Sequence, residues 1–421
     1  MSGNLFGKRA GWNRRSFLLG ASAIATMGAI QQLGLSCWDD RASAATSVSG
    51  QIPFWGVHQA GIVTPDVAAA LVVALDVTAR STAELQQLFH ILTQRIEYLM
   101  SGGILQPLDP KYPPSGSGIL GNEFVADNLT VTVAVGASLF DDRYGLASLK
   151  PRCLTEMPNF AHDRLDPSLC HGDLLLQLCA NHNETNIHAL RDIVKQLAGL
   201  VVLRWQMTGF QQPDTDSHPH RTTVRNLLGF KDGTANPDSQ DERLMNQLIW
   251  VQRNSNEPAW TIGGTYQVVR IIRMFVEFWD RTPLEEQEEI IGRARVTGAP
   301  LGYQHEEDIP DYAKDPNGRK IALDAHIRLA NPRTPQTEAN RILRKGFHYS
   351  RGIDKAGQLD MGLLFMAFQQ NLQRGFETVQ NRLNGEPLEE YIKPIGGGYF
   401  FTLPGVVKKD GYLGESLLEA Q

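Results

Sequence analysis

The loop GFKDGTANP, residues 229–237, places a carboxylate where chemistry could occur. Asp232 stands between Gly229 and Gly233, after the apolar pair Leu227–Leu228 and before an acidic stretch of helical composition. An aspartate in such a turn either caps the backbone through its side-chain oxygen or serves as an acid–base group. The loop by itself leaves both roles open.

The second candidate is His326, in the stretch LDAHIRLANPRT. It lies between the apolar residues Ala325 and Ile327, a turn over residues 331–333 follows, and Arg344 comes eighteen positions after it. Imidazole can ligate a metal or transfer a proton, and a guanidinium can stabilise developing negative charge. Each residue alone is more often structural than functional. Their combination with the loop makes both candidates for a site.

Other catalytic signatures are missing from the sequence. It contains no HExxH metal pair, no CxxCH haem-attachment motif, no GxSxG elbow and no Walker loop. Zinc peptidases, c-type cytochromes, serine hydrolases and NTPases therefore lack their usual anchors. The glycine run GGGYF, residues 396–400, has no following Lys-Ser/Thr and indicates the entry to a strand. No basic stripe suggests a nucleic-acid partner.

The first 44 residues have the layout of an export signal. Lys8, Arg9 and the pair Arg14–Arg15 precede an uncharged run that ends in Ala-Ser-Ala at residues 42–44. A basic segment, an apolar segment and small residues in this order are typical of a cleaved signal peptide. The paired arginine in NRRSFLL resembles a twin-arginine signal, which exports folded proteins. We therefore expect a periplasmic protein without a stable membrane span in its mature form.

Removal of this leader takes away five basic and two acidic residues and so changes the formal net charge from −6 to −9. Three cysteines remain, Cys153, Cys170 and Cys179. They are odd in number and lack CxxC spacing, so one disulfide is possible but a zinc site is not indicated.

Apolar patterns predict two similar halves. Strands are expected at 70–77, 128–136, 173–181, 200–210, 265–280, 362–369 and 396–405, and helices at 81–100, 185–199, 282–293 and 371–383. In the first helix the apolar residues fall on one face, and Ser81 with Glu84 forms a predicted capping box. Each half reads strand–helix–strand twice. This order favours a duplicated α+β unit with antiparallel sheets.

Several separate stretches carry a resemblance to a known family. GFKDGTANP, HIRLANPR, the arginine eighteen residues after that histidine and GLLFMAFQ together resemble the dye-decolourising haem peroxidases. Within them, the chain is similar to the exported deferrochelatase/peroxidase branch of bacterial ferrous-iron uptake. HQAGIVTP at 58–65, EPAWTIGGTYQVVR at 257–270 and YIKPIGGGYFFTLPG at 391–405 extend the likeness over nearly the whole chain.

The resemblance implies an architecture and a cofactor. The expected fold is a pair of ferredoxin-like domains of the dimeric α/β-barrel type. Residues 1–44 would be the signal peptide, 45–225 the N-terminal domain and 226–421 the C-terminal haem-binding domain. One haem b per chain is expected, mainly in the C-terminal half.

The resemblance also assigns roles. His326 would be the proximal iron ligand, with Asp360 as a candidate partner for its other ring nitrogen. Asp232 would exchange a proton with peroxide, and Arg344 would stabilise charge on the breaking O–O bond. Where this chain has Gly346, other members of the family place a polar Asn. Because that polar side chain is missing here, peroxide activation would rest on Asp232 and Arg344 alone.

Further residues are expected to contact the porphyrin. Gly229 and Gly233 would let the backbone approach it closely. The residues expected to bind the cofactor are Gly233, Thr234, Ala235, His326, Asn331, Pro332, Arg333 and Arg344. Of these, Arg333 is a natural partner for a haem propionate.

Two activities of this branch, and one alternative to both, stay open at this point. A peroxidase would use H₂O₂ and oxidise an organic reductant, whereas a deferrochelatase would take iron from haem and leave the porphyrin intact. A haem carrier without turnover is the third possibility, although it would need neither Asp232 nor Arg344. A homodimer and contacts with other iron-uptake components are also expected.

Overall fold

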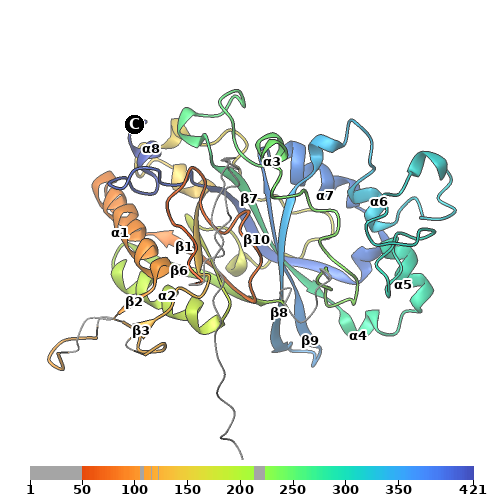
Figure 1. Cartoon of the computed structure of the whole chain (residues 1–421), viewed down its shortest axis with the longest axis horizontal. Coiled ribbons are helices and arrows are strands. Elements are labelled where there is room, and N and C mark those ends of the chain that lie inside the picture. Colours follow the sequence, from red (N-terminus) through yellow and green to blue (C-terminus); the bar gives the residue numbers. More distant parts are fainter. Residues whose placement is uncertain (1–49, 105–108, 115, 122, 213–222) are drawn as a thin grey trace, which may run out of the picture. The chain divides into compact units, whose positions relative to one another are not determined.

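The computed structural model describes residues 50–104, 109–114, 116–121, 123–212 and 223–421. The predicted leader, residues 1–44, lies outside this part of the chain. Eight antiparallel strands close into one barrel, in the order β1-β5-β4-β10-β7-β9-β8-β6 (Figure 1). The strands are β1 Ala69–Val77, β4 Thr130–Gly136, β5 Leu174–Ala180, β6 Val201–Phe210, β7 Thr265–Met274, β8 Leu343–Ile353, β9 Leu359–Gln369 and β10 Ile392–Thr402. A separate two-stranded sheet pairs β2 Gly103–Ile104 with β3 Glu123–Phe124.

The barrel consists of two copies of one strand arrangement. The first half gives the order β4-β5-β1-β6 and the second gives β8-β9-β7-β10, so each half has its first strand between its third and fourth. This is the ferredoxin-like order, and the predicted α+β fold is confirmed. The seams between the halves are short: β10 pairs with β4 at three positions, and β6 pairs with β8 only at Phe210 and His348. The domain boundary predicted at residue 225 stays a prediction.

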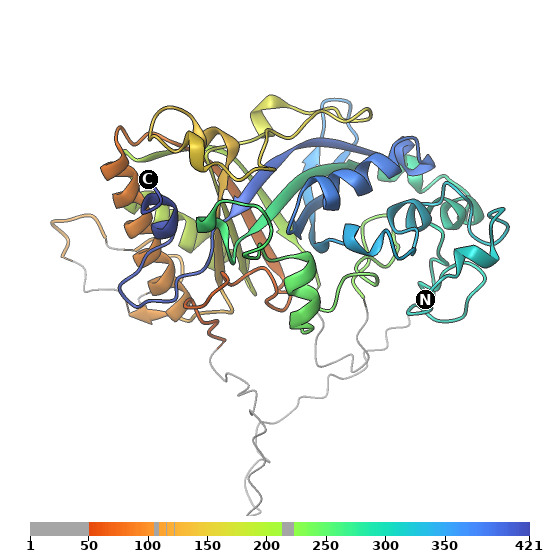
Figure 2. The ribbon, with the colours of Figure 1, turned by 90° about the horizontal axis from the view of Figure 1, so that it is seen from above.

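The helices lie outside the barrel. Their bounds are α1 Thr82–Ser101, α2 Asn183–Gln196, α3 Glu242–Leu248, α4 Val276–Trp279, α5 Leu284–Ile291, α6 His326–Ala330, α7 Thr378–Leu383 and α8 Glu415–Leu418. Figures 1 and 2 show α5 and α6 beside the second-half strands, away from α1. Among the described residues, no helix combines the length and the apolar character needed to cross a membrane.

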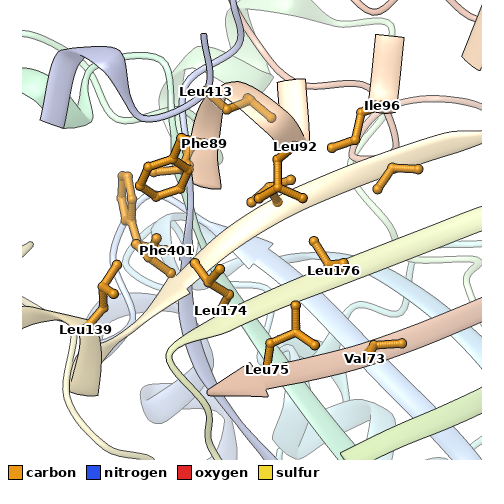
Figure 3. Packing of buried hydrophobic residues seen from close by; sticks show 14 of the residues in the cluster. Val73, Leu75, Phe89, Leu92, Ile96, Leu139, Leu174, Leu176, Phe401 and Leu413 are labelled. Atoms are coloured by element: carbon orange, nitrogen blue, oxygen red, sulfur yellow. The ribbon is translucent and has the colours of Figure 1, made fainter. Parts of the chain in front are cut away.

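Helix α1 follows its predicted pattern closely. Its fully buried residues Phe89, Leu92 and Ile96 pack over Leu75 and Leu176 of the strands (Figure 3). Full burial of each such side chain contributes roughly 1.5–3 kcal/mol. At its start, the Ser81 hydroxyl accepts from the Glu84 amide at 3.2 Å. The Glu84 carboxylate accepts from the Arg80 amide rather than from Ser81, so only half of the predicted capping box is present.

Two expected elements differ from the structure, and β8 was not among the predicted strands. The strand predicted over 265–280 ends at Met274, because Phe275 leaves the extended conformation and α4 begins at Val276. The helix predicted over 371–383 is a π-helical turn, Gln373–Glu377, followed by the short α7. Cys153, Cys170 and Cys179 are all free, so none of the possible disulfides forms among them.

Candidate functional site

A cavity of about 270 Å³ lies mainly among residues of the second half. Its lining brings together Asp232 from the GFKDG loop, Arg344 from β8 and His326 from the start of α6. The predicted contact residues Gly233, Thr234, Ala235, Asn331 and Arg333 line it as well. Pro332 is not among the lining residues. The three groups that were candidates for chemistry therefore face one space.

Asp232 and Arg344 form an ion pair at the cavity wall. Arg344 Nη1 lies 2.8 Å from Asp232 Oδ1, and each side chain is 30% exposed. Asn236 fixes the loop to the strand, because its Nδ2 donates to the Arg344 carbonyl at 2.7 Å and its Oδ1 accepts from the Arg344 amide at 3.2 Å. This side-chain clamp sets the position of Asp232 relative to Arg344.

The two loop glycines have different reasons to be glycine. Gly233 lines the cavity and has a φ of +124°, a backbone angle that residues other than glycine rarely adopt. Gly229 does not line the cavity, contrary to the prediction that it allows close approach of the porphyrin. Its φ is +87°, and a Cβ there would lie 2.6 Å from Arg295 Nη2. Packing against Arg295 and backbone conformation therefore require glycine at this position.

His326 is held by a carboxylate that the sequence analysis did not identify. Its Nδ1 lies 2.7 Å from Glu386 Oε2, and the Glu386 side chain is only 3% exposed. Burial disfavours the imidazolium, but the charge and hydrogen bond of Glu386 outweigh it and raise the pKa of His326. Because Nδ1 is engaged, Nε2 is the nitrogen left for a ligand in the cavity.

The predicted partner of His326, Asp360, is wrong. Asp360 lies on β9 and pairs with Arg351 of the neighbouring β8, with Oδ2 2.8 Å from Arg351 Nη2. The cross-strand arginine satisfies its charge on another part of the sheet. Glu386, 60 residues after His326, stands in its place.

Glu386→Gln is expected to retain haem but to raise the reduction potential of the iron. A neutral amide is a weaker hydrogen-bond acceptor for the Nδ1 proton than a carboxylate, so the imidazole becomes a weaker donor to the metal. Mutation of such hydrogen-bond partners of a ligand histidine changes metal affinity or activity by about 10–100-fold. Potentiometric titration of the haem-loaded variant measures the effect. Asp360→Asn is the matched control and should leave the potential unchanged. Equal potentials in the two variants would refute the role of Glu386.

One wall of the cavity is rich in arginines. The lining includes Arg293, Arg333, Arg341, Arg344 and Arg382. Within the described residues, Arg333 Nε and Arg382 Nε are buried without a hydrogen-bond partner. Burial lowers the pKa of Arg382, and burial together with the Arg333 charge lowers that of Arg293. Buried donors without partners are costly, so this wall fits a ligand that carries carboxylates, as haem carries two propionates.

The first half also contributes to the cavity, which the sequence analysis did not predict. Phe160, His162 and Asp163 line it from the segment between β4 and β5. Asp163 forms a buried two-point ion pair with Arg270 of β7, one contact being 3.0 Å. His162 Nε2 lies 2.7 Å from Glu389 Oε2. The segment is thus fixed against the second half by the Asp163–Arg270 ion pair and the His162–Glu389 contact.

Comparisons with known proteins agree with this site. The model of the Dyp-type peroxidase N-terminal domain matches residues 59–211, and that of the C-terminal domain matches residues 223–407. Deferrochelatases of Shigella sonnei and Escherichia coli O157:H7 are each 53% identical over 416 residues, covering 96% of this chain and 97% of theirs. The chain belongs to the Dyp-type peroxidase family.

Solved members of the family have the same fold as this Dyp-type peroxidase. The enzyme from Cellulomonas bogoriensis is 37% identical with a TM-score of 0.78, and the match covers 88% of this chain and 98% of that one. Ferric DtpA from Streptomyces lividans is 33% identical with a TM-score of 0.79, covering 89% and 100%. The chain is a haem-dependent peroxidase. The accessible nitrogen of His326, the apolar walls, and Arg333 and Arg382, whose buried Nε atoms have no partner among the described residues, provide the donors and surfaces that a haem needs.

Proposed function

We propose that the protein is an exported haem b enzyme that reacts with H₂O₂ and also recovers iron from haem, leaving protoporphyrin intact, for iron uptake. The observation that carries the proposal is the Asp232–Arg344 pair at 2.8 Å in the same cavity as a histidine held by a buried carboxylate. A passive haem carrier would need the histidine but not the pair. The names of the relatives that are 53–57% identical support the iron-recovery part.

In this proposal each residue has a separate task. Haem, when bound, supplies a redox-active iron next to His326. Asp232 takes a proton from H₂O₂ and returns it to the departing oxygen, a task that requires an acid–base group within hydrogen-bond reach. Arg344 orients the peroxide and stabilises the charge that develops on it. Asn236 keeps the two side chains in register through its bonds to the Arg344 backbone.

Iron recovery treats haem as a substrate. When ferrous iron leaves, the porphyrin takes up two protons in its place, so the products are Fe²⁺ and metal-free porphyrin. The test is anaerobic incubation of the haem-loaded protein with dithionite and a ferrous chelator. We expect one chelated iron per porphyrin, with porphyrin fluorescence appearing as the haem absorption falls. If the haem stays intact but the protein still reacts with H₂O₂, the protein is a general Dyp-type peroxidase without iron release. If the haem reacts in neither assay, the protein is a haem carrier.

The cofactor and assembly details belong to the same proposal. We expect one haem b per chain, and the pyridine haemochrome spectrum identifies the haem type and its ratio to protein. A homodimer is expected in solution, which light scattering measures. Association with other ferrous-iron uptake components is also proposed, and co-purification from iron-limited cells would test it.

Export is proposed to depend on the arginine pair in residues 1–44. Replacement of Arg14 and Arg15 by Lys should keep the charge but retain precursor in the cytoplasm, because twin-arginine export reads the two arginines themselves. Fractionation and immunoblotting measure the result. Arg9→Lys, outside the pair, is the control and should be exported normally. Efficient periplasmic delivery of the double variant would indicate an ordinary secretory route instead.

A further inference from the structure

A buried glutamate stands behind the loop that carries Asp232. Glu306 is 7% exposed and does not line the cavity. Its carboxylate accepts hydrogen bonds from Thr223 Oγ1, from Lys231 Nζ and, at 2.8 Å, from Thr234 Oγ1. Two of these donors flank Asp232 in the sequence. One carboxylate thus holds the loop on both sides of Asp232.

The same residue also fixes a cavity arginine. The Glu306 carbonyl accepts from Arg293 Nη1 at 2.9 Å, and Arg293 Nη1 also donates to the Gly298 carbonyl at 2.6 Å. Charge and hydrogen bonds from Lys231 and the two threonines keep the pKa of Glu306 low despite its burial. Glu306 is therefore a charged anchor shared by the GFKDG loop and the arginine-rich wall.

Lys231 is the cation that this anchor restrains. It is adjacent to Asp232 and lines the cavity, yet its ammonium is paired with Glu306, the side chains being 16% and 7% exposed. Its stem passes close to Gly298, where a Cβ would lie 2.6 Å from Lys231 Cδ. Released from Glu306, a flexible ammonium next to Asp232 would compete with Arg344 for the carboxylate.

We propose that Glu306 is a positioning residue: it holds Lys231 away from Asp232 and keeps that carboxylate paired with Arg344 and available for proton transfer. This inference rests on the proposed function, because it concerns the step assigned to Asp232. It adds a residue that neither contacts the cavity nor belongs to the motifs of the sequence analysis.

The test begins with Glu306→Gln. The amide oxygen can still accept from the threonines, but no charge remains to hold Lys231. We expect haem content near wild type and a rate constant with H₂O₂ that falls about 10- to 100-fold, as for displaced catalytic groups. In the haem-free protein, the amides of residues 225–236 should exchange hydrogen faster. Glu307→Gln, the exposed neighbour, should change neither quantity.

The double variant Glu306→Gln/Lys231→Met separates positioning from bulk stability. It removes the competing ammonium together with its partner, and neutral replacement of a buried pair is often tolerated. The proposal predicts that most of the rate returns. If the single variant does not fold, a near wild-type rate in the double variant still supports the proposal. A wild-type rate in Glu306→Gln, or a double variant that reacts far more slowly than wild type, would overturn it.

Asp232→Asn in the same series distinguishes this failure from failure of the proposed function. If Asp232→Asn reacts with H₂O₂ at the wild-type rate, the acid–base role itself is wrong. If Asp232→Asn is slow but Glu306→Gln is not, only the positioning role is wrong.

Discussion

Asp232→Asn is expected to keep its haem and to lose most of its reaction with H₂O₂. Asparagine has nearly the same shape, its amide oxygen can accept from Arg344, and the backbone bond from residue 232 to the Val224 carbonyl is unaffected. The amide cannot accept and return a proton, a function worth about 10²–10⁴-fold in rate. Stopped-flow absorbance at matched haem occupancy measures the fall.

Two companion variants define what this result means. Asp238→Asn alters an exposed carboxylate of the same stretch and should react at the wild-type rate. Arg344→Leu should also slow the reaction, through lost charge stabilisation rather than lost proton transfer. If Asp232 only shapes the turn, Asp232→Asn instead loses haem or stability, and the molecules that still hold haem react normally.

His326→Ala is expected to fold but to purify largely without haem. In the proposed site the imidazole would provide the protein's bond to the iron, whereas the arginines would contact only the periphery of the haem. Haem per chain follows from the pyridine haemochrome, and circular dichroism reports on folding. His305→Ala, which alters an exposed histidine, is the matched control. Wild-type haem occupancy with an unchanged Soret band in His326→Ala would contradict the assignment of the ligand.

Seven of the eight barrel strands were predicted because they contain apolar runs, and α1 was predicted because it has one apolar face. Strand β8 was missed because its sequence, LRKGFHYSRGI, mixes charged and polar residues with apolar ones. One error occurs where the apolar residues of a strand continue directly into those of a short helix. Val276 and Trp279 are buried helical residues that directly follow β7, and their apolar character made the strand appear longer than it is. Nothing in the pattern of residues 371–383 distinguishes a π-helical turn from an α-helical one.

The site residues likewise fall into those that the sequence indicates and those that it does not. Asp232, His326 and Arg344 lie in stretches whose residue types and spacing could be read directly. Glu386 and Glu306 could not be found in this manner, because each acts on a residue 60 or more positions away, His326 and Thr234 respectively. Their positions follow only from the closed barrel. An acidic residue before a turn has no sequence signal that distinguishes a buried anchor from a solvated side chain.

The buried contact between Asp163 and Arg270 makes cofactor binding a property of the whole chain. A fragment that begins at residue 223 would lack one wall of the cavity and would leave Arg270 without its counterion. We therefore expect haem to bind the joined halves and not either half alone. A ligand that binds only the joined halves stabilises that state. For haem the gain would be about 4 kcal/mol when its free concentration is a thousandfold above its dissociation constant. Loss of the whole cofactor would then expose the short seams between the halves to opening and proteolysis.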